Sequence, residues 1–372
     1  MKVLYLTTSI RPEDFSLLEE KAQIKPNPAG QNFHQRLIHT LNGFVSLEVV
    51  SLLPDREGIL QKGKVTDGVI SYTYVTSRKS KVARAFFGPK DICAAASKAD
   101  IIVYDSLSLT LAKASQLIAS RQKIQRVAVC TDSPFNLTGT DSFYQKQVIS
   151  LSSSADGYFC LTNGLNTLFN PANKPNLIKP GIAEEAEQYQ NPHPRPYFYY
   201  GGALFVKDGT KALIEAYQSS NAAYDLVIAG HGNYEAEVAR AAASDPRIRF
   251  LGQISKKKNA AYEANASLLI NPRLYREDLD DTSVPSKVIE YLTLGSAIVS
   301  TRSKDLQTLF PEDINWLDSG EGLLPFLNSH LDENGKLKGI KPNNAQQKVL
   351  DILGFEEIGR SFTGFLQNLI QK

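Results

Sequence analysis

The sequence predicts an α/β protein with two doubly wound, Rossmann-like domains. Short apolar runs alternate with longer segments whose apolar residues recur at helical spacing, which is typical of parallel sheets covered by helices. The alternation stops at Gln188–Pro196, a stretch with three prolines and no apolar pattern, and then starts again. A chain of 372 residues is long enough for two cores. We therefore predict an N-terminal domain over residues 1–187, a C-terminal domain over residues 188–345 and a terminal helix over residues 346–372.

The composition favours a globular, cytoplasmic protein over a membrane-spanning or nucleic-acid-binding one. A net charge of +2 provides no general attraction for nucleic acid. No apolar run approaches the roughly 20 residues that span a bilayer, and the first residues resemble a strand more than a signal peptide. Cys93, Cys130 and Cys160 lack Cys-x-x-Cys spacing and the five histidines are dispersed, so neither a disulfide framework nor a zinc site is expected.

The N-terminal half begins with a strand, a long loop and a helix. The helix has Phe33, Leu37, Ile38 and Leu41 on one face. Gly30 stands at its start, where the missing side chain would let a substrate approach the backbone, although an ordinary turn glycine would look the same. Strands are predicted at residues 3–8, 47–53, 69–75, 101–104, 125–130 and 157–161.

The strand that ends at Cys130 is followed by Thr131, Asp132, Ser133 and Pro134. A carboxylate at the carboxyl end of a strand can hold the hydroxyl group of an acceptor. Asp132 fits this role, and it fits the role of a helix cap equally well.

The segment Arg78–Lys90 contains several cations, no acidic residue and the pair Phe86–Phe87. This mixture suits the surface of an anionic membrane, where each Lys or Arg contributes on the order of 1 kcal/mol. One interpretation is therefore a peripheral contact with the inner face of the cell membrane. The alternative is a solvated loop whose two aromatic side chains are buried.

The C-terminal half repeats the alternation, with a Gly201–Gly202 pair after its first strand. The pair is not a dinucleotide fingerprint, because Gly-x-Gly-x-x-Gly is absent. Later in this half, the N–H groups of Ser286 and Lys287 would lie free at a helix start and attract phosphate. Glu290, one turn further, could accept hydrogen bonds from sugar hydroxyls. Strands are predicted at residues 197–200, 226–229, 248–251, 267–270 and 297–300, with helices at 207–218, 234–243 and 284–294.

The segment NPR…VPSKVIEYLTLGSAIVST, within Ala266–Arg302, resembles the donor-binding motif of GT-B glycosyltransferases similar to family 4. Pro285–Tyr291 fits the Pro-Ser-Lys-x-x-Glu-Tyr form of one sub-branch. The resemblance covers nearly the whole chain and implies two Rossmann-like domains that face a cleft, with the terminal helix crossing back to the N-terminal domain. It also implies a nucleotide-diphosphate sugar as donor, such as a UDP-sugar or GDP-sugar, and no metal or other cofactor.

The resemblance assigns donor contacts to one loop and helix start. Glu290 matches the glutamate that binds the ribose in the family, and the N–H groups of Ser286 and Lys287 would hold the diphosphate. Glu290 is the second glutamate of the family's pair. Thr282 stands eight residues earlier, where the family has the first, and Thr282 and Ser283 lie in the loop that borders the donor.

The resemblance also assigns the cations. Gly202, Lys207 and Gly209 match the family's Gly-Arg-Leu-x-x-x-Lys-Gly segment, with Ala203 at the Arg position. Arg273 would supply the missing cation, so that Lys207 and Arg273 neutralise the leaving diphosphate.

Other family positions are matched less closely. Gln253 and Ile254 would contact the base. Thr131 replaces a histidine near the donor sugar, Asp132 would serve the acceptor, and Gly30 is what remains of a Gly-rich loop. Asp278–Leu279–Asp280 matches a metal-binding Asp-x-Asp of another glycosyltransferase fold, but no metal is expected here.

We therefore expect a glycosyltransferase that moves a hexose-type sugar to a hydroxyl of a glycan or lipid-linked acceptor, with retention, in polysaccharide or glycoconjugate synthesis. One alternative is a non-catalytic partner of another transferase that binds nucleotide sugars. Another is an epimerase of similar architecture.

Overall fold

The computed structural model describes residues 1–23, 28–55, 57–77, 80–137 and 141–371. They form two compact units. Unit 1 contains residues 1–182, 281–283 and 355–372, and unit 2 contains residues 183–280 and 284–354. The chain therefore enters unit 1 three times, and the divide between the halves falls a few residues before the predicted hinge. Each unit is described by itself below.

Unit 1 is built on an eight-stranded sheet in the order β3-β4-β2-β1-β5-β6-β7-β8. Its strands pair in parallel except for the antiparallel pair of β3 and β4. The central strands are buried along nearly their whole length, as expected for a sheet covered on both faces. The strands are β1 (Lys2–Thr7), β2 (Ser46–Leu52), β3 (Gly63–Asp67), β4 (Ile70–Val75), β5 (Ile101–Asp105), β6 (Gln125–Cys130), β7 (Gly157–Cys160) and β8 (Asn176–Ile178).

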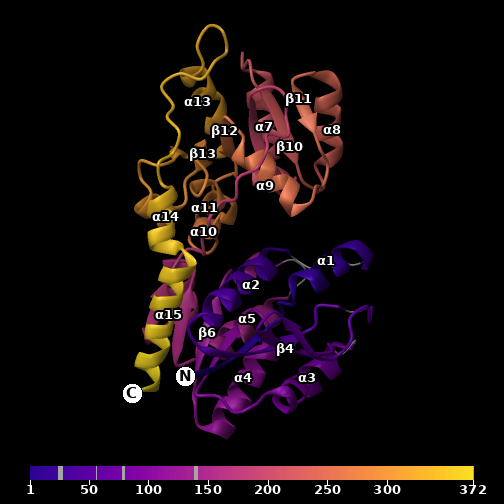
Figure 1. Cartoon of the computed structure of the whole chain (residues 1–372), viewed down its shortest axis with the longest axis vertical. Helices are drawn as coiled ribbons and strands as arrows, with labels where there is room; N and C mark the ends of the chain where they lie inside the picture. Colours follow the sequence, from indigo (N-terminus) through magenta and orange to yellow (C-terminus); the bar gives the residue numbers. More distant parts are fainter. Residues whose placement is uncertain (24–27, 56, 78–79, 138–140, 372) are drawn as a thin grey trace. The chain divides into compact units, whose positions relative to one another are not determined.

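The helices of unit 1 begin where the sequence offers a side-chain oxygen as a cap. Ser108, Asp141 and Thr162 each accept a hydrogen bond from the N–H group three residues later. The helices are α1 (Pro12–Lys21), α2 (Pro28–Asn42), α3 (Lys81–Ala95), α4 (Leu109–Gln122), the 3-10 turn η1 (Pro134–Asn136), α5 (Ser142–Ser152), α6 (Asn163–Phe169) and α15 (Phe355–Ile370) (Figure 1).

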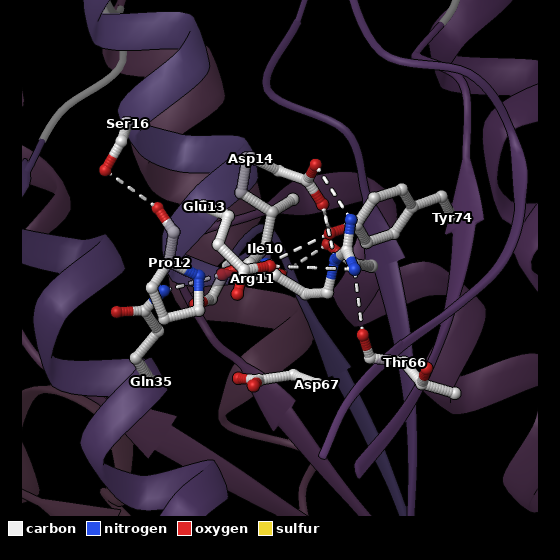
Figure 2. A network of polar contacts seen from close by, with 12 residues as sticks. Ile10, Arg11, Pro12, Glu13, Asp14, Ser16, Gln35, Thr66, Asp67 and Tyr74 are labelled. Atoms are coloured by element: carbon white, nitrogen blue, oxygen red, sulfur yellow. Dashed lines mark hydrogen bonds and ion pairs between the residues drawn. The ribbon is translucent and has the colours of Figure 1, made fainter.

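Helix α1 lies where the sequence predicted only a long loop. Its N-terminus is fixed by Arg11, which donates to both carboxylate oxygens of Asp14, at 2.7 and 3.0 Å, and to the backbone oxygen of Thr66 (Figure 2). The Tyr74 hydroxyl donates to Asp14 at 2.6 Å and accepts from the Arg11 backbone N–H at 3.0 Å. These bonds join α1 to the β3–β4 pair, a contact between distant segments that local sequence patterns do not reveal.

The basic and aromatic segment is helical rather than a loop. Its described part belongs to α3, which Ser80 caps, while Arg78 and Lys79 lie outside the described residues. Phe86 and Phe87 are 69% and 53% exposed, so they are not buried as one interpretation required. Gly88 packs against the Thr110 side chain of α4, where a Cβ would overlap it.

Unit 2 is a six-stranded parallel sheet in the order β11-β10-β9-β12-β13-β14. Its apolar core lies between the sheet and the helices around α7 and α13. The edge strand β14 was not predicted. The strands are β9 (Tyr197–Gly201), β10 (Asp225–Ala229), β11 (Ile248–Phe250), β12 (Leu268–Asn271), β13 (Ala297–Thr301) and β14 (Asn315–Leu317).

The helices of unit 2 follow its strands in turn. They are η2 (Val206–Asp208), α7 (Thr210–Gln218), α8 (Glu235–Ser244), α9 (Lys256–Ala264), α10 (Glu277–Asp280), α11 (Ser286–Leu292), α12 (Lys304–Leu309), η3 (Gly320–Gly322), α13 (Leu323–His330) and α14 (Gln346–Leu353).

The single terminal helix of the prediction is two helices, separated at Gly354. Helix α14 contacts α11 in unit 2. Helix α15 lies beside α2 in unit 1 (Figure 1), and its Phe362 ring is 4.8 Å from that of Phe159. A Cβ on Gly354 would overlap the Leu350 carbonyl, so the glycine allows the chain to leave one unit and enter the other.

Candidate functional site

The strand order of unit 2 defines where a ligand would bind. From β9 the chain moves outward through β10 to β11, and it then returns to the other side of β9 to form β12. The connections after β9 and β12 therefore diverge, and open α/β sheets bind ligands at the carboxyl ends of such a strand pair. The Gly201–Gly202 loop follows β9, and Pro272–Arg273 follows β12.

The loop after β9 is held by backbone contacts with the next loop. The N–H of Gly202 donates to Ala229 O at 3.0 Å, and that of Leu204 donates to His231 O at 3.0 Å. Gly230 has a φ of +143° and lies so close to Gly202 that a Cβ would overlap the Gly202 carbonyl. Position 230 therefore requires a glycine, because of both its φ angle and the lack of space for a side chain. These contacts fix the position of the loop after β9 relative to the loop after β10.

The Pro272–Arg273 segment is held from both sides. Gly209, with φ +81°, and Gly320 each face the Pro272 carbonyl so closely that a Cβ would overlap it. The N–H of Gly320 and the hydroxyl of Thr301 both donate to Arg273 O. Arg273 is half-buried and its backbone position is thus determined by three other segments of unit 2.

The structure brings the predicted cations onto adjacent loops. The N–H of Leu274 donates to Lys207 O at 3.3 Å, so the residues after Arg273 run beside the turn that carries Lys207. Lys207 is exposed, with its Nζ 5.7 Å from the centre of the Phe205 ring. The exposed ammonium of Lys207 on one loop and the half-buried guanidinium of Arg273 on the next are suitable for binding an anionic ligand.

The side chain of Lys287 reaches the same place, which the sequence did not indicate. Lys287 is half-buried in the first turn of α11, and its Nζ is 4.2 Å from the centre of the Tyr200 ring. A Cβ on Gly202 would overlap this Nζ. The ammonium therefore occupies the space that a side chain at position 202 would fill.

The charges around Lys287 come from several elements. Burial lowers the pKa of Lys287 to about 8, even though the carboxylates of Asp208, Glu263 and Glu290 favour the charged form; Arg273 adds to the lowering. These four groups thus act electrostatically on one ammonium at the carboxyl end of β9 and β12.

Most of the remaining predicted donor contacts also lie in unit 2. Glu290 is half-buried on α11, one turn after Lys287, and Ser286 is exposed at the helix start. Gln253 is exposed and Ile254 half-buried, just after Gly252, whose carbonyl accepts from the Gly230 N–H at 2.9 Å. The loop after β11 is therefore connected through the loop after β10 to Gly202.

A small hollow of the same unit lies next to Arg273. It is bordered by Tyr275, Arg276, Asp280 and Arg302. The Arg302 guanidinium stacks on the Tyr275 ring at 3.9 Å, so this side of the loop is also basic and aromatic.

The other predicted residues lie in unit 1. Asp132 accepts hydrogen bonds from the Ser133 N–H and the Asn136 side chain, both at 2.7 Å, which stabilises the η1 turn. Asn136 also donates to the Thr282 hydroxyl at 3.3 Å, so the 281–283 segment, which includes Ser283, belongs to this unit. Gly30 has open space where a Cβ would be, so packing does not require a glycine there.

A buried polar cluster in unit 1 was missed at the sequence level. His34 of α2 is 2.7 Å from the Tyr5 hydroxyl through Nδ1 and 3.6 Å from Asp105 through Nε2. Burial acts to raise the pKa of Asp105, but His34 and the Leu107 N–H together hold it below its ordinary value. The cluster joins β1, β5 and α2, and no spacing pattern in the sequence connects these three residues.

The described residues show neither a metal-binding cluster nor a membrane-spanning helix. They contain no group of three or more His, Cys, Asp or Glu side chains placed to hold a metal ion. No helix among them is long and apolar enough to cross a bilayer. The side chain of Asp278, in the Asp-x-Asp motif, lies outside the described part.

Part of the chain matches a known protein family, and the whole fold is similar to solved structures. Residues 195–317 match the family model described as glycosyl transferases group 1. The chain matches no curated protein sequence. Sucrose-phosphate synthase from Thermosynechococcus elongatus is similar over 100% of both chains, with a TM-score of 0.71 and 11% identity. HepE from Anabaena, in complex with UDP and glucose, aligns over 99% of this chain and 100% of its own, with a TM-score of 0.68 and 13% identity.

A third structure, the catalytic domain of starch synthase IV from Arabidopsis thaliana bound to ADP and acarbose, covers 100% of both chains with a TM-score of 0.64 and 10% identity. These similarities establish two Rossmann-like domains of the GT-B fold. Together with this fold, the glycosyl transferases group 1 match over residues 195–317 supports a glycosyltransferase.

Proposed function

We propose that this protein transfers a hexose-type sugar from a nucleotide-diphosphate sugar to a hydroxyl of a glycan or lipid-linked acceptor, in polysaccharide or glycoconjugate synthesis. The observation that supports the proposal is that Lys207 and Arg273 lie on adjacent loops after β9 and β12. Arg273 and Glu290 both act electrostatically on the Lys287 ammonium beside Gly202. A diphosphate needs fixed positive charge, and a ribose needs a hydrogen-bond acceptor. The presence of UDP with HepE and of ADP with starch synthase IV supports a nucleotide as ligand.

Each residue would have a distinct role. Lys207 and Arg273 neutralise the diphosphate as the bond to the anomeric carbon breaks, and Glu290 anchors the ribose. The backbone N–H groups of Ser286 and Lys287 add donors. The acceptor proton passes to the departing phosphate oxygen, which requires no nucleophilic side chain and gives retention of configuration.

Further contacts complete the proposed donor and acceptor sites. Gln253 and Ile254 border the base, and Gly202 lets the phosphates approach the backbone. Asp132 and Gly30, both in unit 1, are proposed to serve the acceptor side of the reaction, and Thr282 and Ser283 to border the donor. For Asp132 this is a second role, because its carboxylate already stabilises the η1 turn.

The donor is tested by isothermal titration with UDP-glucose, UDP-N-acetylglucosamine, GDP-mannose and ADP-glucose, each also incubated to detect transfer or slow hydrolysis. We expect one donor to bind and release its nucleoside diphosphate. Glu290→Ala should weaken its binding about tenfold, the effect of one hydrogen bond. Glu333→Ala, an exposed glutamate of the same unit, is the matched control and should change nothing. Unchanged affinity in Glu290→Ala would contradict the role given to Glu290.

Binding without turnover, on any acceptor offered, would instead support a non-catalytic partner of another transferase. Conversion of the donor into a different nucleotide sugar, without an acceptor, would support an epimerase. The anomeric configuration of the product, read by NMR, tests retention.

A lipid-linked acceptor would place the enzyme at a membrane surface through α3. Phe86 and Phe87 project from this helix, and Arg84 and Lys90 flank them. The test is co-sedimentation with phosphatidylglycerol vesicles and with neutral phosphatidylcholine vesicles. Binding to the anionic vesicles alone, lost in Phe86→Ser/Phe87→Ser, is the expected result; equal binding by both proteins would contradict it.

A further inference from the structure

The ammonium of Lys287 lacks a hydrogen-bonding partner among the residues that the structure describes. Its contact is the face of the Tyr200 ring, at 4.2 Å, and none of the described residues accepts a hydrogen bond from Nζ or forms an ion pair with it. An ammonium has three N–H donors, and a ring face attracts the charge without replacing the acceptors that water provided. A partly buried cation held in this way is ready to receive an anion.

The surrounding backbone keeps this position open. Gly202 has no side chain, and adding one would displace the Lys287 ammonium. The loop cannot move away from Lys287, because the Gly202 N–H donates a hydrogen bond to Ala229 O and Gly230 packs directly against Gly202. The next residue, Ala203, carries no charge, whereas the family that this sequence resembles has an arginine at this position. The loop after β9 therefore contributes space, and α11 contributes the cation.

We propose that the Lys287 side chain, and not only its backbone, binds the diphosphate of the donor and stabilises it as the leaving group. This inference rests on the proposed function. When the bond between the anomeric carbon and the diphosphate oxygen breaks, the electron pair remains on that oxygen, and Lys287 Nζ–H donates a hydrogen bond to the diphosphate. The acceptor oxygen forms the new bond to the anomeric carbon and its proton passes to the phosphate.

The surroundings make Lys287 a more effective cation than Lys207. Lys207 is exposed, so solvent screens its charge, whereas the half-buried Lys287 acts through a medium of lower dielectric. The groups that face the ammonium are Asp208 of η2, Glu263 of α9, Glu290 of α11, Arg273 after β12 and the Tyr200 ring of β9. Burial lowers the pKa of Lys287 to about 8 in the unliganded protein, and a bound diphosphate would raise it by stabilising the charged form.

The experiment is isothermal titration of the full chain with UDP, GDP and ADP at pH 7. Lys287→Met keeps the length of the side chain and removes its charge. We expect this variant to bind the nucleotide with about tenfold to a hundredfold lower affinity, as for a lost charged hydrogen bond. Lys287→Arg should restore most of the affinity. Lys338→Met, at an exposed lysine of the same unit, is the matched control and should bind like the wild type.

A pH series separates a charge effect from a structural one. Wild-type affinity should fall about tenfold between pH 7 and pH 9, because the free ammonium loses its proton in this range while the phosphates stay ionised. Lys287→Arg should bind equally at both values.

The outcomes distinguish the two proposals. If the wild type binds none of the three nucleotides, the proposed function fails and this inference fails with it. If the wild type binds and Lys207→Met weakens binding, but Lys287→Met binds like the wild type, the inference alone is overturned. A pH profile of Lys287→Arg identical to that of the wild type would overturn it as well.

Discussion

At the residue scale, Lys287 combines a role in binding with a penalty in folding. Its pKa is lowered from 10.5 to about 8 by burial, so the unfolded chain binds more protons than the folded chain between these values. The penalty is fully present below pH 8 and is relieved as the pH rises toward 10.5.

Lys287→Met should therefore stabilise the unliganded protein at pH 7 by about 1 kcal/mol while it weakens nucleotide binding. The difference in the free energy of unfolding between Lys287→Met and the wild type should be smaller at pH 10. Urea unfolding of both proteins at the two pH values measures it, and a variant less stable than the wild type at pH 7 would contradict the assigned environment.

Asp105 is the opposite case, because its lowered pKa means that folding favours the carboxylate. Stability from Asp105 is present above the ordinary carboxyl value and is lost as the pH falls through the lowered one. Asp105→Asn should lose about 2–3 kcal/mol at pH 7, since it leaves buried His34 without its carboxylate.

The difference should narrow below pH 4, which urea unfolding of both proteins would show. Asp318→Asn, at a carboxylate whose side chain is 98% exposed, is the control and should cost less than about 0.5 kcal/mol. A loss of stability at Asp105 that did not depend on pH would indicate a packing effect instead.

At the element scale, the Arg11–Asp14 ion pair contributes to the attachment of helix α1. The contact with Arg11 and Tyr74 outweighs burial and holds the pKa of Asp14 below its ordinary value, so this attachment also weakens in acid. Asp14→Asn should destabilise the protein by about 1–2 kcal/mol at pH 7 and increase amide exchange throughout Pro12–Lys21. Glu13→Gln, which alters an exposed neighbour, should leave exchange unchanged.

The same scale shows how far sequence patterns reach. Strands at the sheet centres, such as β6 and β10, follow from continuous apolar runs bounded by turns. Edge strands β3 and β14 were missed because they are short and polar or only half-buried. Helix α1 was missed because its stability comes from Tyr74, far away in the sequence. In α3, Gly88 and Pro89 obscured a helix that packing against α4 stabilises.

The candidate site was predictable to a similar degree. Local motifs indicated the loops that carry Lys207, Arg273 and Glu290, because each follows a recognisable strand or opens a helix. They did not reveal the approach of the Lys287 ammonium to Gly202, since it joins residues from two different strand connections. The sub-branch of the family and the roles of individual site residues stay predictions until nucleotide binding is measured.

At the scale of the whole molecule, the chain order and the two units do not coincide. Residues 355–372 complete unit 1 although residues 183–280 and 284–354 form unit 2. Ile358, Phe362, Leu366 and Leu369 of α15 are buried in unit 1. A chain that ends at Gly354 should therefore lower the melting temperature of unit 1 and leave that of unit 2 nearly unchanged.

Differential scanning calorimetry of the truncated chain, with nucleotide added to mark unit 2, would resolve the two transitions. Removal of Gln371 and Lys372 alone is the control and should have no effect, because the buried residues of α15 end at Leu369. A shift of the nucleotide-sensitive transition on truncation at Gly354 would contradict this division.

The return of the last helix also has a consequence for synthesis in the cell. While the ribosome translates unit 2, the N-terminal part of unit 1 has already been synthesised. It still lacks α15, which covers Phe159 and the neighbouring apolar surface. That surface stays uncovered until α15 has been translated and has left the ribosome. We therefore expect chaperones to bind the exposed apolar surface of the nascent N-terminal half. Unit 1 completes its fold only after unit 2 has been translated.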